Sequence, residues 1–128
     1  MATQNKVVFV VDDDPSALSG IARLLKVHGF QAVTFASVDD FCARANARNA
    51  GCLVLDIQLG QASGIELKCQ LAASGSLPPV IFITGNDTNV THGKALQAGC
   101  VAYLTKPFPG NSFIDAVTLA INRPPCAS

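Results

Sequence analysis

Short apolar runs and longer amphipathic segments alternate along the 128 residues of this chain. Five of the runs are rich in β-branched residues and too short for helices, so they predict buried strands. These runs span residues 6–11, 31–35, 52–56, 79–84 and 101–107. Because each run is almost continuously apolar, we expect the strands to be parallel and covered on both faces of the sheet.

The segments that follow the strands carry helical signals. After the first strand, apolar residues recur with helical spacing and stop at Gly29, which is typical of a helix C-terminus. Ser37 with Asp40, and Ser63 with Glu66, have the spacing of capping boxes and predict the starts of two further helices. The last helix presents an apolar side made of Phe113, Ile114, Val117 and Ile121.

The segment before Gly99 is the weakest of the predicted helices. Residues 88–93 are threonine, asparagine, valine, histidine and glycine, which are mediocre or poor helix formers. Only residues 94–98 favour a helix strongly. We therefore expect this helix to begin late or to fray at its start.

Five strand–helix pairs in succession predict an α/β fold, an open doubly wound parallel sheet with five helices. Ligands of such sheets bind beyond the carboxyl ends of the strands. The first strand leaves Asp12 and Asp13 at that end, the third leaves Asp56, the fourth leaves Thr84 and the fifth leaves Lys106. We expect these side chains to meet at one edge of the sheet.

Composition narrows the class of protein. The chain is 49% hydrophobic and 14% charged, with nine basic and nine acidic residues, which is typical of a globular domain without a basic patch for nucleic acid. The N-terminal apolar run ends in acids, so it predicts neither a signal peptide nor a membrane span. The five cysteines form no CxxC pair, and we interpret them as mostly buried apolar residues of a reducing, cytoplasmic protein.

Three consecutive acids, Asp12 to Asp14, follow the first strand, where like charges repel one another. Asp14 precedes Pro15, so it is well placed as the N-cap of the first helix. Asp12, Asp13 and Asp56 then form a carboxylate cluster that needs a cation. Oxygen ligands without histidine or cysteine favour Mg²⁺, with Mn²⁺ as an alternative.

A divalent cation beside a lysine and a hydroxyl is an arrangement that binds a phosphoryl group. Lys106 would neutralise phosphoryl oxygens, and Thr84 would donate a hydrogen bond to one of them. A carboxylate can itself be the nucleophile, and Asp56 at the tip of the middle strand is the candidate. Taken singly, Thr84 is also compatible with an ordinary strand residue, and Lys106 with a solvated lysine at a strand end.

The segments VVDDD, LVLDIQLGQASG, FITG and YLTKPF together resemble a response-regulator receiver domain, most closely receivers of the FixJ type. The resemblance covers residues 1–123 and leaves 124–128 as a short tail. It implies a flavodoxin-like (βα)5 fold with strand order 2-1-3-4-5. It also implies that Asp56 accepts a phosphoryl group from a sensor histidine kinase, a phosphotransfer protein or a small acyl phosphate.

The resemblance implies a ligand set for the Mg²⁺ ion as well. Asp13 and Asp56 would bind the ion directly, together with the backbone carbonyl of Gln58. Asp12 would form the acid pair with Asp13 and would act on the ion through water.

The remaining roles that the resemblance implies concern switching. Thr84 and Lys106 match the family's hydroxyl and lysine, and Tyr103 matches its switch aromatic, whose ring swings inward when Thr84 moves toward the phosphoryl group. The bond between Lys106 and Pro107 is often cis in this family. The fourth helix, fifth strand and fifth helix would form the output face and support a phosphorylation-dependent homodimer. Tyr103 could equally be an ordinary half-buried aromatic residue.

Three features depart from the family pattern. Gly60 stands where the family usually has proline, so we expect a looser loop there. Gln58 is a longer amide than many relatives carry at that position. Residues 86–93 are unusually polar for the start of the fourth helix. None of the three removes a required group, so we expect a functional receiver.

Two other functions fit parts of the pattern. Haloacid-dehalogenase-like phosphatases also use a strand-end aspartate with Mg²⁺, but their general acid–base position is Gln58 here, which cannot transfer a proton. We therefore expect no enzyme activity beyond self-phosphorylation and self-dephosphorylation. The second alternative is a binding module that keeps the fold but is never phosphorylated, and the complete set of site residues disfavours it. Neither GxGxxG nor GxxxxGK[ST] occurs, so a nucleotide site is not expected.

Overall fold

The computed structural model describes residues 5–75 and 77–122. Within these ranges, five parallel strands form one sheet in the order β2-β1-β3-β6-β7, which is the order 2-1-3-4-5 among the long strands. The predicted fold class is confirmed. The predicted tail, residues 124–128, lies outside the described residues. The strands of the sheet are β1 (Val7–Val11), β2 (Gln31–Phe35), β3 (Cys52–Asp56), β6 (Val80–Thr84) and β7 (Ala102–Thr105).

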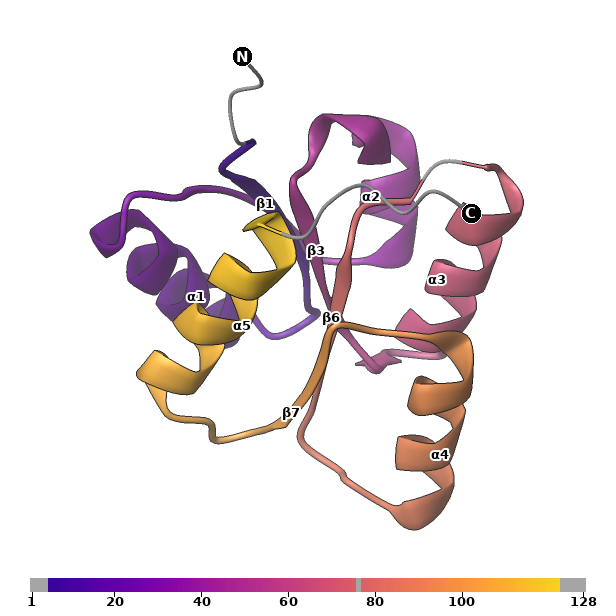
Figure 1. The fold of residues 1–128 in the computed structure, drawn as a ribbon. Coiled ribbons are helices and arrows are strands. Elements are labelled where there is room, and N and C mark those ends of the chain that lie inside the picture. Colours follow the sequence, from indigo (N-terminus) through magenta and orange to yellow (C-terminus); the bar gives the residue numbers. More distant parts are fainter. Residues whose placement is uncertain (1–4, 76, 123–128) are drawn as a thin grey trace.

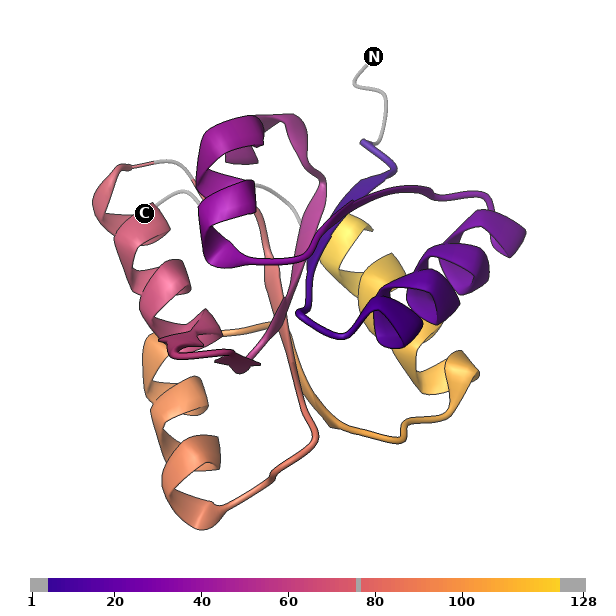
Figure 2. The same ribbon diagram turned by 180° about the vertical axis from the view of Figure 1, so that it is seen from behind.

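Helices cover both faces of the sheet. α1 and α5 lie on one face, and α2, α3 and α4 lie on the other, as Figures 1 and 2 show from opposite sides. Among the described residues, no helix is both long and apolar enough to cross a membrane. The helices are α1 (Pro15–Val27), α2 (Val38–Arg44), α3 (Gly64–Ala73), α4 (Asn89–Ala98) and α5 (Gly110–Asn122), with a short 3-10 helix, η1 (Ala47–Asn49), before β3.

The sheet separates two hydrophobic cores, because successive side chains of a strand point to opposite faces. In β1, Val8 and Val10 pack in the core beneath α1 and α5, whereas Phe9 and Val11 pack in the core on the other face. All five residues of β3 and all five of β6 are buried. The central strands are therefore fixed by packing along their whole length, and the polar residues at their ends are held in place.

Side-chain caps begin three of the helices at the positions that the sequence predicts. Asp14 accepts a hydrogen bond from the Ser16 N–H ahead of α1, with Pro15 in the first turn. Ser37 caps α2 and Ser63 caps α3 in the same way. Of the three consecutive acids that follow β1, Asp14 therefore has a structural role as a helix cap, which Asp12 does not share.

α4 begins earlier than the sequence predicts. The prediction of a late start is wrong, because the helix runs from Asn89 and Thr88 is its N-cap. Thr88 Oγ1 accepts from the Thr91 N–H at 3.0 Å, and the two hydroxyls are 2.9 Å apart. His92 stacks on Tyr103 with ring centroids 4.5 Å apart. The cap and the tertiary stacking offset the poor helix propensity of this turn.

A hairpin that the sequence analysis did not predict follows β3. β4 (Gln58–Leu59) and β5 (Ala62–Ser63) pair antiparallel around a two-residue turn, contrary to the expectation of a looser loop. The turn begins at Gly60, whose φ of 64° is typical of glycine at the first central position of a tight hairpin turn. Leu59 is 6% exposed and anchors the hairpin in the core.

Candidate functional site

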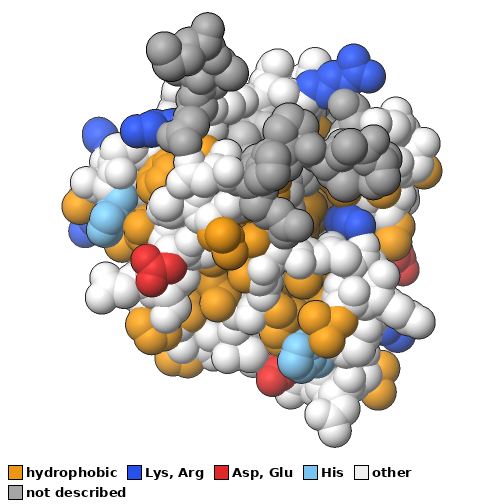
Figure 3. Space-filling view, in the orientation of Figure 1, with side chains coloured by type: hydrophobic (Ala, Val, Ile, Leu, Met, Phe, Trp, Pro, Cys, Tyr) orange, Lys and Arg blue, Asp and Glu red, His pale blue; other side chains and the backbone are white. Residues whose placement is uncertain are grey.

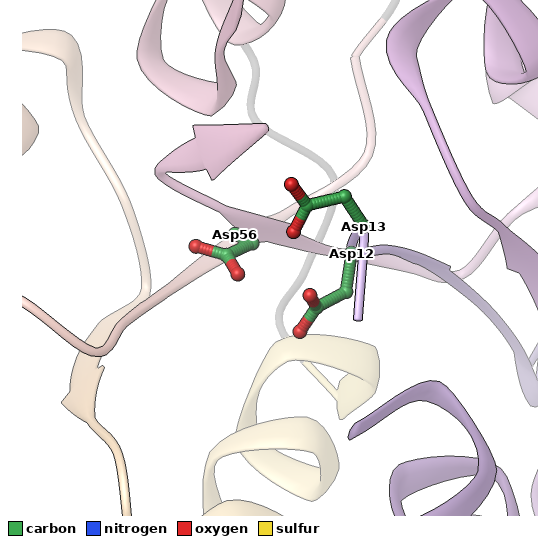
Figure 4. A group of neighbouring side chains, drawn as sticks. All are labelled: Asp12, Asp13 and Asp56. Carbon is green, nitrogen blue, oxygen red and sulfur yellow. The ribbon is translucent and has the colours of Figure 1, made fainter. Parts of the chain in front are cut away.

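The carboxyl ends of β1 and β3 bring three acids together (Figure 4). Asp12 and Asp13 follow β1, Asp56 ends β3, and each offers a carboxylate oxygen within 4.8 Å of the others. Asp12 is 0% exposed and Asp56 is 5% exposed, whereas Asp13 is exposed to solvent. Like charges this close, two of them buried, need a positive partner.

Lys106 is that partner. Its Nζ lies 2.7 Å from Asp12 Oδ2 and 2.9 Å from Asp56 Oδ2. Its backbone N–H donates to the Thr84 carbonyl at 2.7 Å, and its peptide bond to Pro107 is cis. Burial alone would lower the pKa of Lys106, but the hydrogen bonds to the two carboxylates raise it above its ordinary value. The amine therefore stays charged and neutralises part of the cluster.

Backbone N–H groups also hold the buried acids. Asp12 Oδ1 accepts from the N–H of Asp14, and Asp56 Oδ1 accepts from the N–H of Gln58, both at 3.0 Å. Burial raises the pKa of Asp56, and the hydrogen bonds from Lys106 and Gln58 oppose that rise without cancelling it. Each buried carboxylate thus has both of its oxygens engaged.

An open hollow of about 550 Å³ lies in front of Asp13 and Asp56. The hairpin forms one wall, and the start of the β6–α4 loop forms part of another. Gln58 contributes to the hairpin wall, so the predicted metal-ligand residue does lie at the site. The lining residues are Asp13, Asp56, Ile57, Gln58, Gly60, Ala62, Ser63, Gly85 and Lys106.

Thr84 directly precedes a residue that lines this hollow. It is 0% exposed at the end of β6, and its Oγ1 accepts from the Asn86 N–H at 3.1 Å. Gly85, the next residue, lines the hollow, whereas Thr84 itself is not part of the lining. The structure therefore brings Asp12 and Asp56 into direct contact with Lys106, groups Asp13 with these two acids, and places Thr84 at the end of the neighbouring strand β6.

Tyr103 makes contacts that the sequence analysis did not predict. Its hydroxyl donates to Asp87 Oδ1 at 2.7 Å, and its half-buried ring stacks on His92 at an interplanar angle of 14°. Two effects raise the pKa of Tyr103 to about 12: burial is the larger, and the hydrogen bond to Asp87 is the second. The ring is therefore held on the side of the β6–α4 loop by two residues that come from that loop and from α4.

This contact predicts an unusual phenol titration. Tyr103 is the one tyrosine of the chain, which also lacks tryptophan, so near-ultraviolet absorbance reports its phenolate alone. At pH 10 the folded protein should contain much less phenolate than the half expected of unfolded chain. The raised pKa stabilises the fold below pH 10, and this contribution should be lost as the pH rises toward about 12.

Asp87→Asn tests the origin of that shift. The variant should form more phenolate at pH 10 than the wild type, but still less than the guanidinium-unfolded chain, because the burial remains. Asp115→Asn, at an exposed position of α5, serves as the matched control. Equal phenolate fractions in Asp87→Asn and the wild type would mean that Asp87 does not hold the phenol in solution.

The donor set fits a divalent cation with an anionic group beside it. Carboxylate oxygens are the ligands that Mg²⁺ prefers, and three of them converge here, one on an exposed side chain. A lysine amine at the same place can stabilise the charge of a phosphoryl group. The hollow in front of Asp56 gives such a group access to the carboxylate.

Comparisons with known proteins agree with this chemistry. The family model of the response regulator receiver domain matches residues 8–118. Response regulator protein TmoT of Ectopseudomonas mendocina is 31% identical over 125 residues, covering 98% of this chain and 57% of that protein. Transcriptional regulatory protein FixJ of Azorhizobium caulinodans is 31% identical over 116 residues, covering 91% of this chain and 55% of that protein. The chain thus spans slightly more than half the length of these relatives.

Solved structures show the same fold. The response regulator StyR is 37% identical with a TM-score of 0.82, covering 90% of this chain and 58% of that one. The beryllofluoride-activated receiver domain dimer of NtrC4 is 26% identical with a TM-score of 0.83, covering 91% of this chain and 96% of that one. The sequence match, the fold and the grouping of acids with lysine lead to one conclusion: this chain belongs to the family of response regulator receiver domains of two-component signalling systems.

Proposed function

We propose that Asp56 is the phosphoacceptor of this receiver domain, taking a phosphoryl group from a sensor histidine kinase, a phosphotransfer protein or a small acyl phosphate. One observation carries the proposal: Asp56 ends the central strand β3 beside a second buried acid, with Lys106 Nζ 2.9 Å away. Receiver domains are signalling modules. The chemistry proposed for this chain is limited to its own phosphorylation and dephosphorylation, in the cytoplasm.

The transfer step follows from the position of Asp56. A carboxylate oxygen attacks the phosphorus of the donor, and the new O–P bond forms as the P–N bond to the donor histidine breaks. The electron pair of the broken bond stays on the imidazole nitrogen. Lys106 is placed to neutralise a phosphoryl oxygen, and a movement of Thr84 toward the site would bring its hydroxyl to another. In dephosphorylation, water attacks phosphorus and the O–P bond breaks, which releases inorganic phosphate and restores the carboxylate.

The acids provide the ligands for a divalent cation. Asp13, Asp56 and the backbone carbonyl of Gln58 would hold Mg²⁺, or Mn²⁺, and Asp12 would contact it through water. When bound, the cation supplies positive charge that offsets the charge on the phosphoryl oxygens. Asp12 and Asp56 are already held by Lys106 and by backbone N–H groups, so two of the three acids are ordered in advance.

The output is proposed to pass through Thr84 and Tyr103 to the face made by α4, β7 and α5. If Thr84 moves toward the phosphoryl group, Tyr103 must leave Asp87 and His92 to follow it inward. Hydrophobic side chains gather on this face between α5 and α4 (Figure 3). Exposed Leu96 in α4 and exposed Leu119 in α5 support the proposal of a phosphorylation-dependent homodimer there.

Intact-mass measurement tests the assignment of Asp56. After incubation with acetyl phosphate and Mg²⁺, the wild type should gain the mass of one phosphoryl group. Asp56→Asn should gain none, because an amide is too weak a nucleophile to accept the group. Asp115→Asn, at an exposed acid on α5, should be phosphorylated like the wild type. A phosphorylated Asp56→Asn protein would show that the acceptor lies elsewhere.

A further inference from the structure

The hairpin β4–β5 holds Asp13, the exposed member of the acid cluster. The Gly60 N–H donates to Asp13 Oδ2 at 3.0 Å, across 47 positions of sequence. The other two acids are held differently: Asp12 and Asp56 each accept from an N–H two residues further along, and both contact Lys106. The position of Asp13 is thus tied to the folding of a separate loop.

The conformation of the hairpin fixes the direction of this N–H. Gly60 has a φ of 64° at the first position of the turn, next to the pairing of Leu59 with Ala62. Leu59 is buried beneath the hairpin, and the Gly64 N–H donates to the Ile57 carbonyl at 3.0 Å across its base. The amide is therefore presented from a loop that is anchored at its base and by a buried side chain.

One carboxylate can serve the hairpin and a cation at once. An ionised carboxylate has two oxygens with about four acceptor positions, so a single N–H leaves most of them free. In Figure 4, one oxygen of Asp13 faces Asp12 and Asp56 while the other is directed away from them. An exposed aspartate without such a bond would sample several rotamers, and ordering it on metal binding costs entropy.

We propose that the Gly60 N–H is a positioning group, which orients Asp13 so that its remaining acceptor positions complete the cation site with Asp56. This inference rests on the proposed function, since it assumes that the acids bind a divalent cation. Proline, the residue that the resemblance predicts at position 60, has no N–H and could not make the bond. Glycine at this position therefore provides a hydrogen bond to the metal-binding acid as well as a turn.

Replacing the peptide bond between Leu59 and Gly60 by an ester isolates the contribution of the Gly60 N–H. The ester removes the donor and keeps the side-chain content and shape of the turn. Two native cysteines make the full-length protein accessible by ligation: a synthetic segment of residues 52–68 joins residues 1–51 at Cys52 and residues 69–128 at Cys69. The same ligation with an ordinary Gly60 amide is the matched control. Free Mn²⁺, measured by electron paramagnetic resonance, gives the affinity of each unphosphorylated protein.

The ester should bind Mn²⁺ about tenfold more weakly than the amide, the low end of the effect of removing a hydrogen bond behind a metal ligand. Equal or tighter binding by the ester overturns the positioning role and leaves the proposed function intact. Failure of the amide control to bind Mn²⁺ overturns both.

A second measurement needs no metal and uses the recombinant chain. Asp13→Ala should increase the hydrogen-exchange rate of the Gly60 amide in cation-free protein, because the acceptor is lost. Asp14→Ala, one residue away and not bonded to the hairpin, is the control and should leave Gly60 exchange unchanged. Unchanged Gly60 exchange in Asp13→Ala would mean that the hydrogen bond does not persist in solution, which also overturns the proposal.

Discussion

Gly64→Ala should lower the free energy of unfolding by about 3 kcal/mol, the upper part of the range for overpacking a buried position. A Cβ at Gly64 would lie 2.3 Å from the carbonyl oxygen of Asp56 and 3.0 Å from its carbonyl carbon. These are backbone atoms of the central strand, so no flexible side chain can move aside. Either α3 shifts outward, or the end of β3 moves together with the carboxylate of Asp56.

The neighbouring structure makes this cost specific to Gly64. The residue is buried at the first turn of α3, directly after the N-cap Ser63. Alanine is otherwise the better helix former, so helix propensity alone predicts a gain in stability. Gly93→Ala in α4 is the matched control, because a Cβ built there meets no described atom within 4 Å apart from the two neighbouring residues and the adjacent backbone of α4. That variant should be more stable than the wild type by about 0.5–1 kcal/mol.

Urea unfolding followed by circular dichroism measures both variants. A Gly64→Ala protein as stable as the wild type would contradict the close approach of α3 to the end of β3. If the helix is displaced as expected, phosphorylation of Gly64→Ala by acetyl phosphate should also be slower, since Asp56 shares the affected backbone.

The strand ends were predictable because burial leaves a simple pattern in the sequence. A strand such as Cys52–Asp56 is apolar until its last residue, and parallel strands place their carboxyl ends at the same edge. This rule places Asp12, Asp56 and Lys106 at one edge of the sheet, and their direct contact also depends on the strand order and on the reach of the lysine side chain. The caps Asp14 and Ser63 were predictable for a similar reason, since each uses residues only a few positions apart.

The contacts that the sequence analysis missed depend on the geometry of loops. Nothing local to Gly60 indicates that its N–H meets Asp13, because the bond requires the hairpin and the end of β1 to be placed correctly first. The signal available was a glycine between Leu59 and the small residue Ala62, which is weak evidence for a tight turn. The bond between Asp87 and Tyr103 also depends on a loop conformation. α4 shows the converse: a local rule predicted a late or frayed start, yet the helix begins at Asn89, with the Thr88 cap and the stacking of His92 on Tyr103 in its first turn.

Lys106→Met should destabilise the protein by about 3 kcal/mol at neutral pH, as expected when one partner is removed from a buried ion pair. Methionine keeps most of the length of the apolar stem and removes the charge. Asp12 is 0% exposed and Asp56 is 5% exposed, so the substitution leaves two largely buried carboxylates without their charged partner. The lysine side chain itself is 25% exposed, which places the cost at the lower end of the usual range.

The loss of stability caused by Lys106→Met should depend on pH in a defined direction. Burial already raises the pKa of Asp56, and Lys106 is one of the groups that oppose this rise, so its removal should raise the pKa further. A raised pKa in the folded state means that the folded protein binds the proton more tightly than the unfolded chain. Stability is therefore regained as the pH falls toward the ordinary value of 3.8 and is lost as it rises through the folded pKa. The deficit of Lys106→Met should be largest at neutral pH and smaller at about pH 5.

Two further measurements separate charge from packing. Adding Asp12→Asn to Lys106→Met should recover part of the lost stability, because one unpaired buried charge is removed, and a double-mutant cycle gives the size of that coupling. Saturating Mg²⁺ should stabilise Lys106→Met more than the wild type, since a bound cation replaces the missing positive charge at Asp12 and Asp56. A deficit that is the same at both pH values, and unaffected by Asp12→Asn, would show that Lys106 stabilises the fold through its apolar stem. With the expected dependence, Asp12, Asp56 and Lys106 form one electrostatic unit, in which the amine that stabilises the unphosphorylated fold is also the amine proposed to neutralise a phosphoryl group on Asp56.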